Sequence, residues 1–195
     1  MTSARVRGRP RKDATRVGSA SIVEAAKRLT VESGKLPSIR AIASRLDVDP
    51  MAIYHYFESK QALLESMAAS IVDSVYQPEA GADWKAELSR LAVSYVDILR
   101  AYPGLLEAML ASPVVAPVEL FTRRFLVAVE GLGADQNTKQ DAMYLLVDYL
   151  HGFIYAATCA TEDTGQLQSE DVVKPLRLLF AGMQTDPTSA LKGES

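Results

Sequence analysis

The sequence predicts an all-α protein, with a small N-terminal unit of short helices followed by a larger helical bundle. Three observations predict it. Apolar residues recur at three- and four-residue spacing, as in Ile22, Ala25, Ala26 and Leu29, which places them on one face of a helix. Residues that cap helices stand just before these stripes. No segment shows the strict alternation of polar and apolar residues that a half-buried strand needs.

Two helices are expected before residue 47. The first starts near Ser19, with Ser19 or Ser21 as its cap, and Gly34 fits its C-terminal stop. Ser38 is expected to cap a second, shorter helix, since serine accepts a hydrogen bond from a free N–H of the first turn. The apolar stripe of this second helix is Ile39, Ile42, Ala43 and Leu46.

Two more helices complete the N-terminal unit. Asp49 is a good cap, and Pro50 suits the first helical position because its missing N–H would have no partner there. This third helix should run to about Phe57. Ser59 caps a fourth helix, which should run to roughly Val75.

A break at Pro78 to Asp83 separates this unit from the rest. Pro175 lies within the last expected helix, which should either kink there or begin just before it. We therefore expect a flexible arm over 1–18, a first domain over 19–75 and a second over 76–195. The helices expected in the second domain are 84–102, 104–111, 117–132, 138–161 and 169–184.

Charge is unevenly spread along the 195 residues. The formal net charge is -3, which taken whole argues against a nucleic-acid partner. Residues 1–75, however, hold twelve Lys and Arg against eight Asp and Glu, a net charge of +4, and residues 76–195 carry a net charge of -7. Within the first part, residues 1–16 alone carry +5. Such asymmetry suggests a nucleic-acid-binding half, or else a solvated tail that binds nothing.

The composition argues against a membrane protein, an internal disulfide, an enzyme and a metal site. No apolar run reaches the length of a membrane helix, and no signal peptide is evident, so we expect a cytoplasmic protein without a membrane partner. The lone Cys159 excludes an internal disulfide. An enzyme is the main rival, but Cys159 and His151 lie about two helical turns apart and do not form a nucleophile–base pair. Asp148 and His151 are spaced as two metal ligands without a third, so no metal or cofactor is expected.

The second and third helices form a predicted helix-turn-helix. Apolar positions of the two helices can face one another, and small Ala43 allows a close crossing. Asp47 lies in the turn, where such motifs often need a left-handed residue, which Asp tolerates better than most. In this motif the second helix enters the major groove of DNA. The facing residues are Ile42, Ala43, Leu46, Val48, Ile53 and Phe57.

The stretch from Ser38 to Glu65 resembles the DNA-binding domain of TetR-family transcriptional repressors. The block Ile53 to Phe57, followed by Ser59-Lys60 and Ala62-Leu63-Leu64, carries the resemblance. Asp47 departs from the glycine that is common there. The Tyr102-Pro103 step and the segment 151–153 look like the tetracycline-repressor-type C-terminal domain. The resemblance implies a sequence-specific DNA-binding regulator, most simply a repressor that a small-molecule effector releases from its operator.

The same resemblance implies which residues meet DNA. Pro50, Met51 and Ala52 begin the recognition helix and should touch thymine methyl groups. Phe57 should close the small core, where Tyr54 and Tyr56 could also belong. The remaining assignments are a phosphate or guanine edge for Arg40, backbone or bases for Tyr54 and His55, and phosphates for Tyr56 and Lys60.

The N-terminal arm resembles an AT-hook. A Gly-Arg-Pro core with basic flanks is narrow enough to lie in the minor groove of A·T tracts. Arg7, Arg9 and Arg11 would insert there. A purely architectural DNA-binding protein that uses this arm without any sensor is a second rival.

The acidic domain is expected to dimerise and to bind an effector. The helices 138–161 and 169–184 are apolar on broad faces, and the resemblance implies that they pair with their symmetry mates, so the operator should be pseudo-palindromic. A monomeric core is the alternative. An effector would move the fourth helix and the recognition helices. A magnesium–tetracycline ligand is not expected, because His151 is the only histidine in this domain. Candidate effector-binding residues, each of which could equally be plain core, are Trp84, Tyr95, Leu99, Tyr102, Leu106, Met109, Phe121, Phe125, Met143, Leu146 and Tyr155.

Overall fold

A computed structural model describes residues 17–111, 115–159 and 167–184. These residues form α-helices, one 3-10 helix and no strand, as the sequence predicts. The bounds are α1 Ser19–Ser33, α2 Ile39–Arg45, α3 Pro50–Tyr54, α4 Lys60–Val72, α5 Trp84–Arg100, α6 Leu105–Ala111, α7 Ala116–Ala128, α8 Gln136–Cys159, the 3-10 helix η2 Ser169–Val172 and α9 Val173–Gln184.

Helix caps lie largely where the sequence places them. The hydroxyl of Ser38 accepts from the N–H of Ala41, and that of Ser59 from the N–H of Ala62. Gly34 ends α1 with a φ of 66°, a left-handed conformation that glycine adopts without strain. The start of α1 differs from expectation, because the capping position is Gly18 rather than a serine.

Ser21 still serves the start of α1 from inside the first turn. Its Oγ accepts from the N–H of Gly18 at 2.9 Å and donates to the Gly18 carbonyl at 2.9 Å.

The structure decides between the two expectations for Pro175, a kink within the last helix or a helix that begins just before the proline. A 3-10 turn over Ser169–Val172 comes first, and α9 then begins at Val173, so Pro175 lies in the first turn, where its missing N–H has no helical partner.

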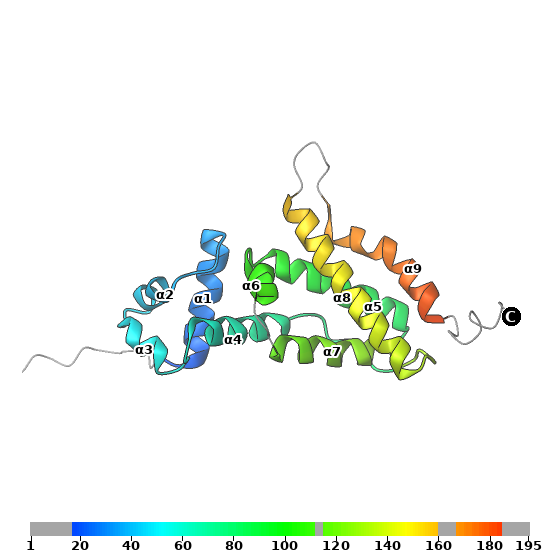
Figure 1. Ribbon diagram of the computed structural model, residues 1–195, viewed down its shortest axis with the longest axis horizontal. Helices are drawn as coiled ribbons and strands as arrows, with labels where there is room; N and C mark the ends of the chain where they lie inside the picture. Colours follow the sequence, from blue (N-terminus) through cyan, green and yellow to red (C-terminus); the bar gives the residue numbers. More distant parts are fainter. Residues whose placement is uncertain (1–16, 112–114, 160–166, 185–195) are drawn as a thin grey trace, which may run out of the picture.

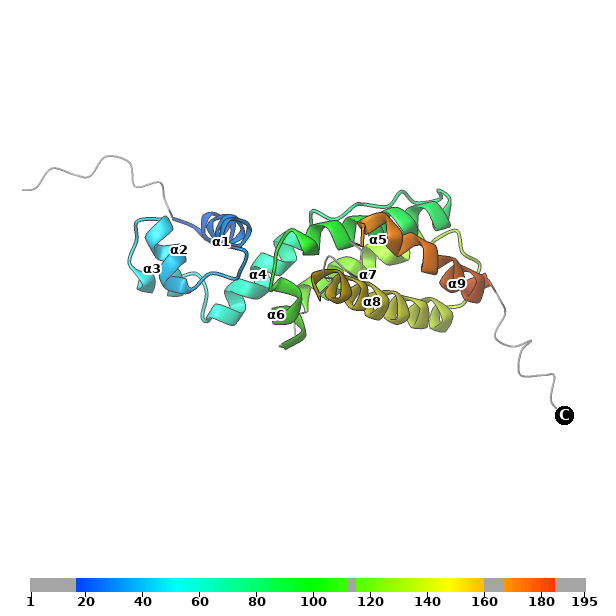
Figure 2. The same cartoon turned by 90° about the horizontal axis from the view of Figure 1, so that it is seen from above.

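Helix α4 connects the two ends of the molecule. Figure 1 shows α1, α2 and α3 gathered at one end and α5, α7, α8 and α9 at the other, with α4 running between them and α6 near the middle. The view from above shows the same arrangement (Figure 2). Helix α4 packs against α1 on one side and α7 on the other. Its buried residues are Leu63, Met67, Ala68, Ile71 and Val72.

Helix α5 is the centre of the larger bundle. It packs against α7, α8, α9 and η2, which together surround it. Burying one leucine or valine side chain stabilises a fold by roughly 1.5–3 kcal/mol, so a helix buried along one whole face holds its neighbours firmly. The buried apolar residues of α5 are Leu88, Leu91, Ala92, Tyr95, Val96 and Leu99.

The segment between α4 and α5 is held by a buried carboxylate. Glu87 is 1% exposed and accepts hydrogen bonds from the backbone N–H of Glu79 at 2.8 Å and the hydroxyl of Tyr76 at 2.9 Å. It also pairs with Arg90. The N–H of Glu79 and these partners together lower the pKa of Glu87, although burial opposes them. This network fixes the course of the chain between α4 and α5, where the sequence predicts a break.

No single helix in the described ranges is long and apolar enough to cross a membrane. Within the part of the chain that the structure describes, one pair of helices, α6 and α7, bent by 105° relative to each other, has that length and composition when taken together.

Candidate nucleic-acid interface and internal cavity

The turn between α2 and α3 has the geometry of a helix-turn-helix. Asp47 has a φ of 53°, so the left-handed residue that the sequence predicts is present. The N–H of Val48 then donates to the carbonyl of Ala43 at 3.0 Å, which closes the end of α2. Asp49 caps α3 through its Oδ1, which accepts from the N–H of Met51 at 2.8 Å. These bonds fix the direction in which α3 leaves the turn.

A small apolar core locks α2 against α3. Ile42, Ala43 and Ile53 are fully buried, and Phe57 is buried just after α3. Leu46 and Val48 are half-buried and pack against the same core. Phe57 therefore has the structural place expected for it.

The opposite face of α3 lies open to solvent. Met51 is 63% exposed and Tyr54 is 43% exposed. Pro50 and Ala52 are half-buried beside them. Arg40, His55 and Lys60 are exposed as well. The residues that the sequence assigns to bases and phosphates are thus all exposed or half-buried rather than buried in the core.

Tyr56 has a partner that the sequence did not suggest. Its hydroxyl donates to the carbonyl of Val17 at 2.6 Å, although its ring is half exposed. While this bond holds, the Tyr56 hydroxyl has no proton to offer a phosphate. The bond holds Val17 beside the end of α3. The candidate arm residues Arg7, Arg9 and Arg11 lie outside the described residues.

A cavity of about 180 Å³ lies among α5, α6, α7 and α8. Its floor holds a polar pair, the Tyr95 hydroxyl and the His151 Nε2, 2.9 Å apart. The two rings stack with centroids 5.9 Å apart, and Phe121 packs edge-on against Tyr95 at 4.8 Å. The lining is Tyr95, Met109, Leu110, Pro117, Val118, Phe121, Thr122, Met143, Tyr144, Val147, Asp148 and His151.

Burial determines the protonation states of Tyr95 and His151. It lowers the pKa of His151, with Asp148 opposing the effect, and it raises the pKa of Tyr95. His151 is therefore mainly neutral at pH 7. Tyr95 and His151 share one hydrogen bond, so one of their two donors is used within the pair and one remains.

Arg124 joins the wall of this cavity to α4. The residue is 8% exposed, and its Nη1 donates to the carbonyls of Val72 at 2.6 Å and Val75 at 2.8 Å. Its Nη2 donates to the carbonyl of Asp73 at 2.8 Å and to the Asp73 carboxylate at 3.1 Å. The guanidinium of α7 thus adds charge-assisted hydrogen bonds to carbonyls at and just after the end of α4, a C-cap supplied by another helix.

A second bond ties the other end of α7 to α4. The Glu65 Oε1 accepts from the backbone N–H of Val115, one residue before α7, at 3.1 Å. The four α7 residues that line the cavity lie between these two attachments, and they are Pro117, Val118, Phe121 and Thr122.

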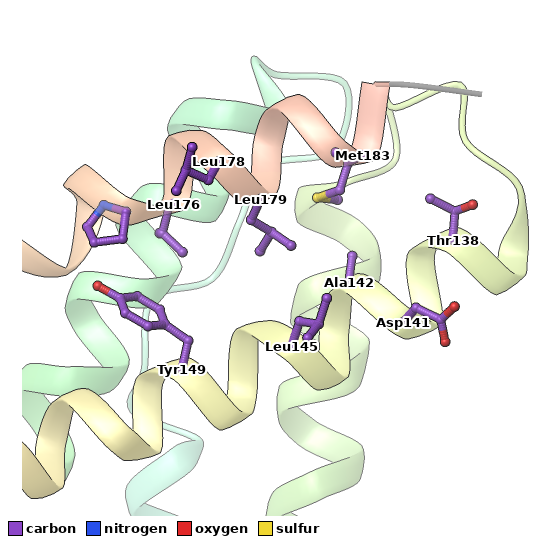
Figure 3. A pocket seen from close by; sticks show the side chains of 11 residues that line it. Thr138, Asp141, Ala142, Leu145, Tyr149, Leu176, Leu178, Leu179 and Met183 are labelled. Atoms are coloured by element: carbon purple, nitrogen blue, oxygen red, sulfur yellow. The ribbon is translucent and has the colours of Figure 1, made fainter. Parts of the chain in front are cut away.

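A second, more open hollow of about 560 Å³ separates the outer faces of α8 and α9. Figure 3 shows Leu145 and Tyr149 of α8 facing Leu176 and Leu179 of α9 across it. Leu178 is 79% exposed at its edge, and Tyr155 is 60% exposed further along α8. This surface is called the α8–α9 groove below.

Two family models match the chain. The model described as "Bacterial regulatory proteins, tetR family" matches residues 22–67, and "Tetracyclin repressor-like, C-terminal domain" matches residues 77–186. The chain belongs to the TetR family. No curated protein sequence matches this TetR-family chain.

Solved structures of the family share its fold. Apo ActR from Streptomyces coelicolor superposes with a TM-score of 0.76 at 15% identity, covering 89% of this chain and 98% of ActR. BioQ with its natural double-stranded DNA operator gives 0.70 at 22% identity, covering 88% and 100%. TetR-Q116A from Acinetobacter baumannii AYE, in complex with minocycline, gives 0.70 at 22% identity, covering 88% and 100%.

The structure separates the residues that the sequence assigned to effector binding into those that line the cavity and those that do not. Tyr95, Met109, Phe121 and Met143 line the cavity. Core positions outside the lining hold Leu99, Leu106, Phe125 and Leu146.

Three further candidates lie elsewhere. Trp84 packs edge-on against Phe180 at 5.3 Å, at the far end of α5. Tyr102 lines a hollow against α1, and Tyr155 points outward from α8. Helix periodicity finds such residues but does not say which of several apolar faces lines a cavity.

Sequence reasoning missed the residues that connect this cavity to the DNA-binding end. Arg124 stands on the buried stripe of α7, three residues after Phe121 and four before Ala128, all buried. An arginine on a buried stripe needs partners, because a buried unpaired charge is costly. That pattern was the available signal. Nothing in the sequence pointed to Glu65 or to the bond between Tyr56 and Val17.

Among the residues in the described ranges, no group of three or more His, Cys, Asp or Glu side chains is placed to hold a metal ion.

Proposed function

We propose that this TetR-family regulator is a homodimeric, sequence-specific DNA-binding repressor whose operator affinity falls when a small molecule enters the cavity. One observation carries the proposal. Helix α7, which forms one wall of the cavity, is bonded at both ends to α4, and α4 packs on the DNA-binding end. The relatives support it by analogy, since BioQ is solved with its operator and TetR-Q116A with minocycline.

The proposal assigns DNA binding to residues 19–75, with 1–18 as a basic arm, and effector binding and dimerisation to 76–195. The two family models, over 22–67 and 77–186, support this division. We propose a binding role rather than catalysis, because the family comprises regulatory proteins. Such a protein works on DNA in the cytoplasm.

The recognition helix α3 is proposed to read bases through its exposed apolar start. Met51 and Tyr54 would reach the major groove, where thymine offers a methyl group. Lys60 stands at the N-terminus of α4, whose free N–H groups favour a phosphate. Arg40 and His55 would add contacts from either side. Tyr56 is assigned a supporting role through its bond to Val17 rather than a phosphate contact.

Dimerisation is proposed through the α8–α9 groove. Leu145 and Leu178 at the groove, and Tyr155 further along α8, are large exposed side chains that a monomer would leave in water. A two-fold axis across this surface would present two recognition helices to one duplex. Half-sites would then lie about one helical turn, roughly 34–36 Å, or a multiple of it apart.

The test is selection of bound duplexes from a random pool by the full chain. The proposal predicts one enriched, pseudo-palindromic sequence. Recovery of unrelated sequences that share only A·T richness would instead support the architectural rival, since a backbone binder shows little sequence preference. A Met51→Ala variant selected in parallel should lose preference at the bases nearest the dyad-related α3 helices while keeping the half-site spacing.

A further inference from the structure

The described lining of the cavity carries negative charge and no positive charge. Asp148 is the one charged side chain in the described lining, and no lysine or arginine joins it. His151 is neutral at pH 7 because burial lowers its pKa. An anion in this cavity would meet a carboxylate and no cation.

Hydrogen-bond donors are also scarce in the lining. The Tyr95 hydroxyl and the His151 Nε2 are hydrogen-bonded to each other, which leaves the pair one further donor. The Thr122 hydroxyl donates to the Val118 carbonyl at 2.8 Å. Tyr144 accepts from the amide of Gln140 at 2.8 Å and keeps its own proton. A carboxylate, phosphate or sulfonate needs several donors when it leaves water, and these walls offer few.

Acceptors and polarisable groups are plentiful by contrast. Phe121, Tyr95 and Tyr144 contribute aromatic faces, and Met109 and Met143 contribute thioethers. Aromatic faces attract cations through the ring quadrupole, most strongly when water is excluded. Asp148 supplies the matching negative charge at the exposed edge of the cavity, next to Tyr144 one turn away on α8.

We propose that the cavity takes a monocationic amphiphile, an amine or quaternary ammonium joined to a compact aromatic or aliphatic body. The ammonium group lies between Asp148 and Tyr144, and the apolar body packs between Phe121 and the methionines. This inference rests on the proposed function, because it names the chemical class of the effector for the same cavity.

Calorimetric titration of the full chain with two small probes tests it. Benzyltrimethylammonium and phenylmethanesulfonate share an aromatic body and differ in the sign of their charge. The cation is expected to bind at least about tenfold more tightly than the anion. Asp148→Asn should weaken the cation about fivefold and leave the anion no weaker. Asp97→Asn is the matched control, since Asp97 is an exposed carboxylate on α5, another helix beside the cavity, and is not part of the lining.

A variant with a blocked cavity distinguishes a wrong ligand class from a wrong binding site. Met143→Trp fills the cavity from α8 and should abolish cation binding. If the anion binds as tightly as the cation to the wild type, and Met143→Trp removes both, the cavity stands as the binding site but the ligand class is wrong. If the cation binds Met143→Trp as well as it binds the wild type, or if neither probe binds the wild type, the ligand proposal fails. Binding that is indifferent to Met143→Trp also removes the cavity from the proposed function.

Discussion

The Nη1 of Arg124 lies 2.6 Å from the carbonyl oxygen of Val72, so the buried guanidinium of α7 ends the helix that leads to the DNA-binding end. The Ser74 hydroxyl and the Val75 N–H donate to carbonyls of the last turn of α4. Arg124 adds three backbone hydrogen bonds from α7. A displacement of α7 therefore pulls directly on α4. This contact gives the effector cavity a physical connection to the recognition helix.

Replacing Arg124 by glutamine should destabilise the protein by about 2–4 kcal/mol, because several buried carbonyls lose charged donors. Urea unfolding followed by helical circular dichroism measures the free energy of unfolding. Arg123→Gln removes a neighbouring exposed arginine and should change that free energy by less than about 0.5 kcal/mol. Equal stabilities for the two variants would contradict the role assigned to Arg124.

Lys60→Ala should weaken binding to the selected duplex and to unrelated duplexes by the same factor, because a phosphate contact carries no sequence information. The slope of log affinity against log salt should fall by about one per protomer. Fluorescence anisotropy at several salt concentrations measures both quantities. Lys174→Ala, which changes an exposed lysine on α9, is the control and should leave the slope unchanged. A sequence-selective loss in Lys60→Ala would place Lys60 on a base instead.

Leu178→Glu should convert the dimer to a monomer, since it puts a charge at the edge of the α8–α9 groove. Sedimentation velocity at micromolar concentration distinguishes the two species. Leu126→Glu places the same charge on an exposed position of α7 and should remain dimeric. If Leu178→Glu sediments as the wild type does, the dimer uses another surface.

Acid should destabilise the fold through His151. Burial holds its folded-state pKa below the ordinary 6.5, so as the pH falls through that value the unfolded chain binds the proton first. The free energy of unfolding should therefore fall between about pH 7.5 and 5.5. His151→Asn removes this titration, so its stability should fall less over the same range. Parallel stability curves for the two proteins would show that His151 does not have the lowered pKa.

Local signals were enough to predict much of the DNA-binding end. Ser38, Asp49 and Ser59 act on N–H groups within three residues, and Asp47 determines its own backbone conformation. These short-range effects depend on sequence alone. The exposure of Met51 follows from the same short-range geometry once Ile53 is buried.

The cavity was harder to predict because its walls come from segments far apart in the chain. Tyr95 meets His151 across 56 residues, and Arg124 meets Val72 across 52. Trp84 shows the difficulty plainly. It lies on the same helix as Tyr95, but its ring packs on Phe180 at the opposite end of α5. Periodicity assigns both residues to apolar faces and gives no information on which helix will cover each face.

The central claim is that the cavity controls DNA binding through α7 and α4. The most direct test is the dissociation constant of the selected duplex for the wild type and for Met143→Trp, whose indole occupies the cavity as an effector would. Met143→Leu, which keeps the side-chain volume, is the control, and circular dichroism and sedimentation confirm that all three proteins are folded dimers. Coupling between two sites is typically about 1–3 kcal/mol, so Met143→Trp should bind the duplex roughly 5- to 150-fold more weakly than the wild type. A folded, dimeric Met143→Trp that binds the duplex with wild-type affinity would contradict the account.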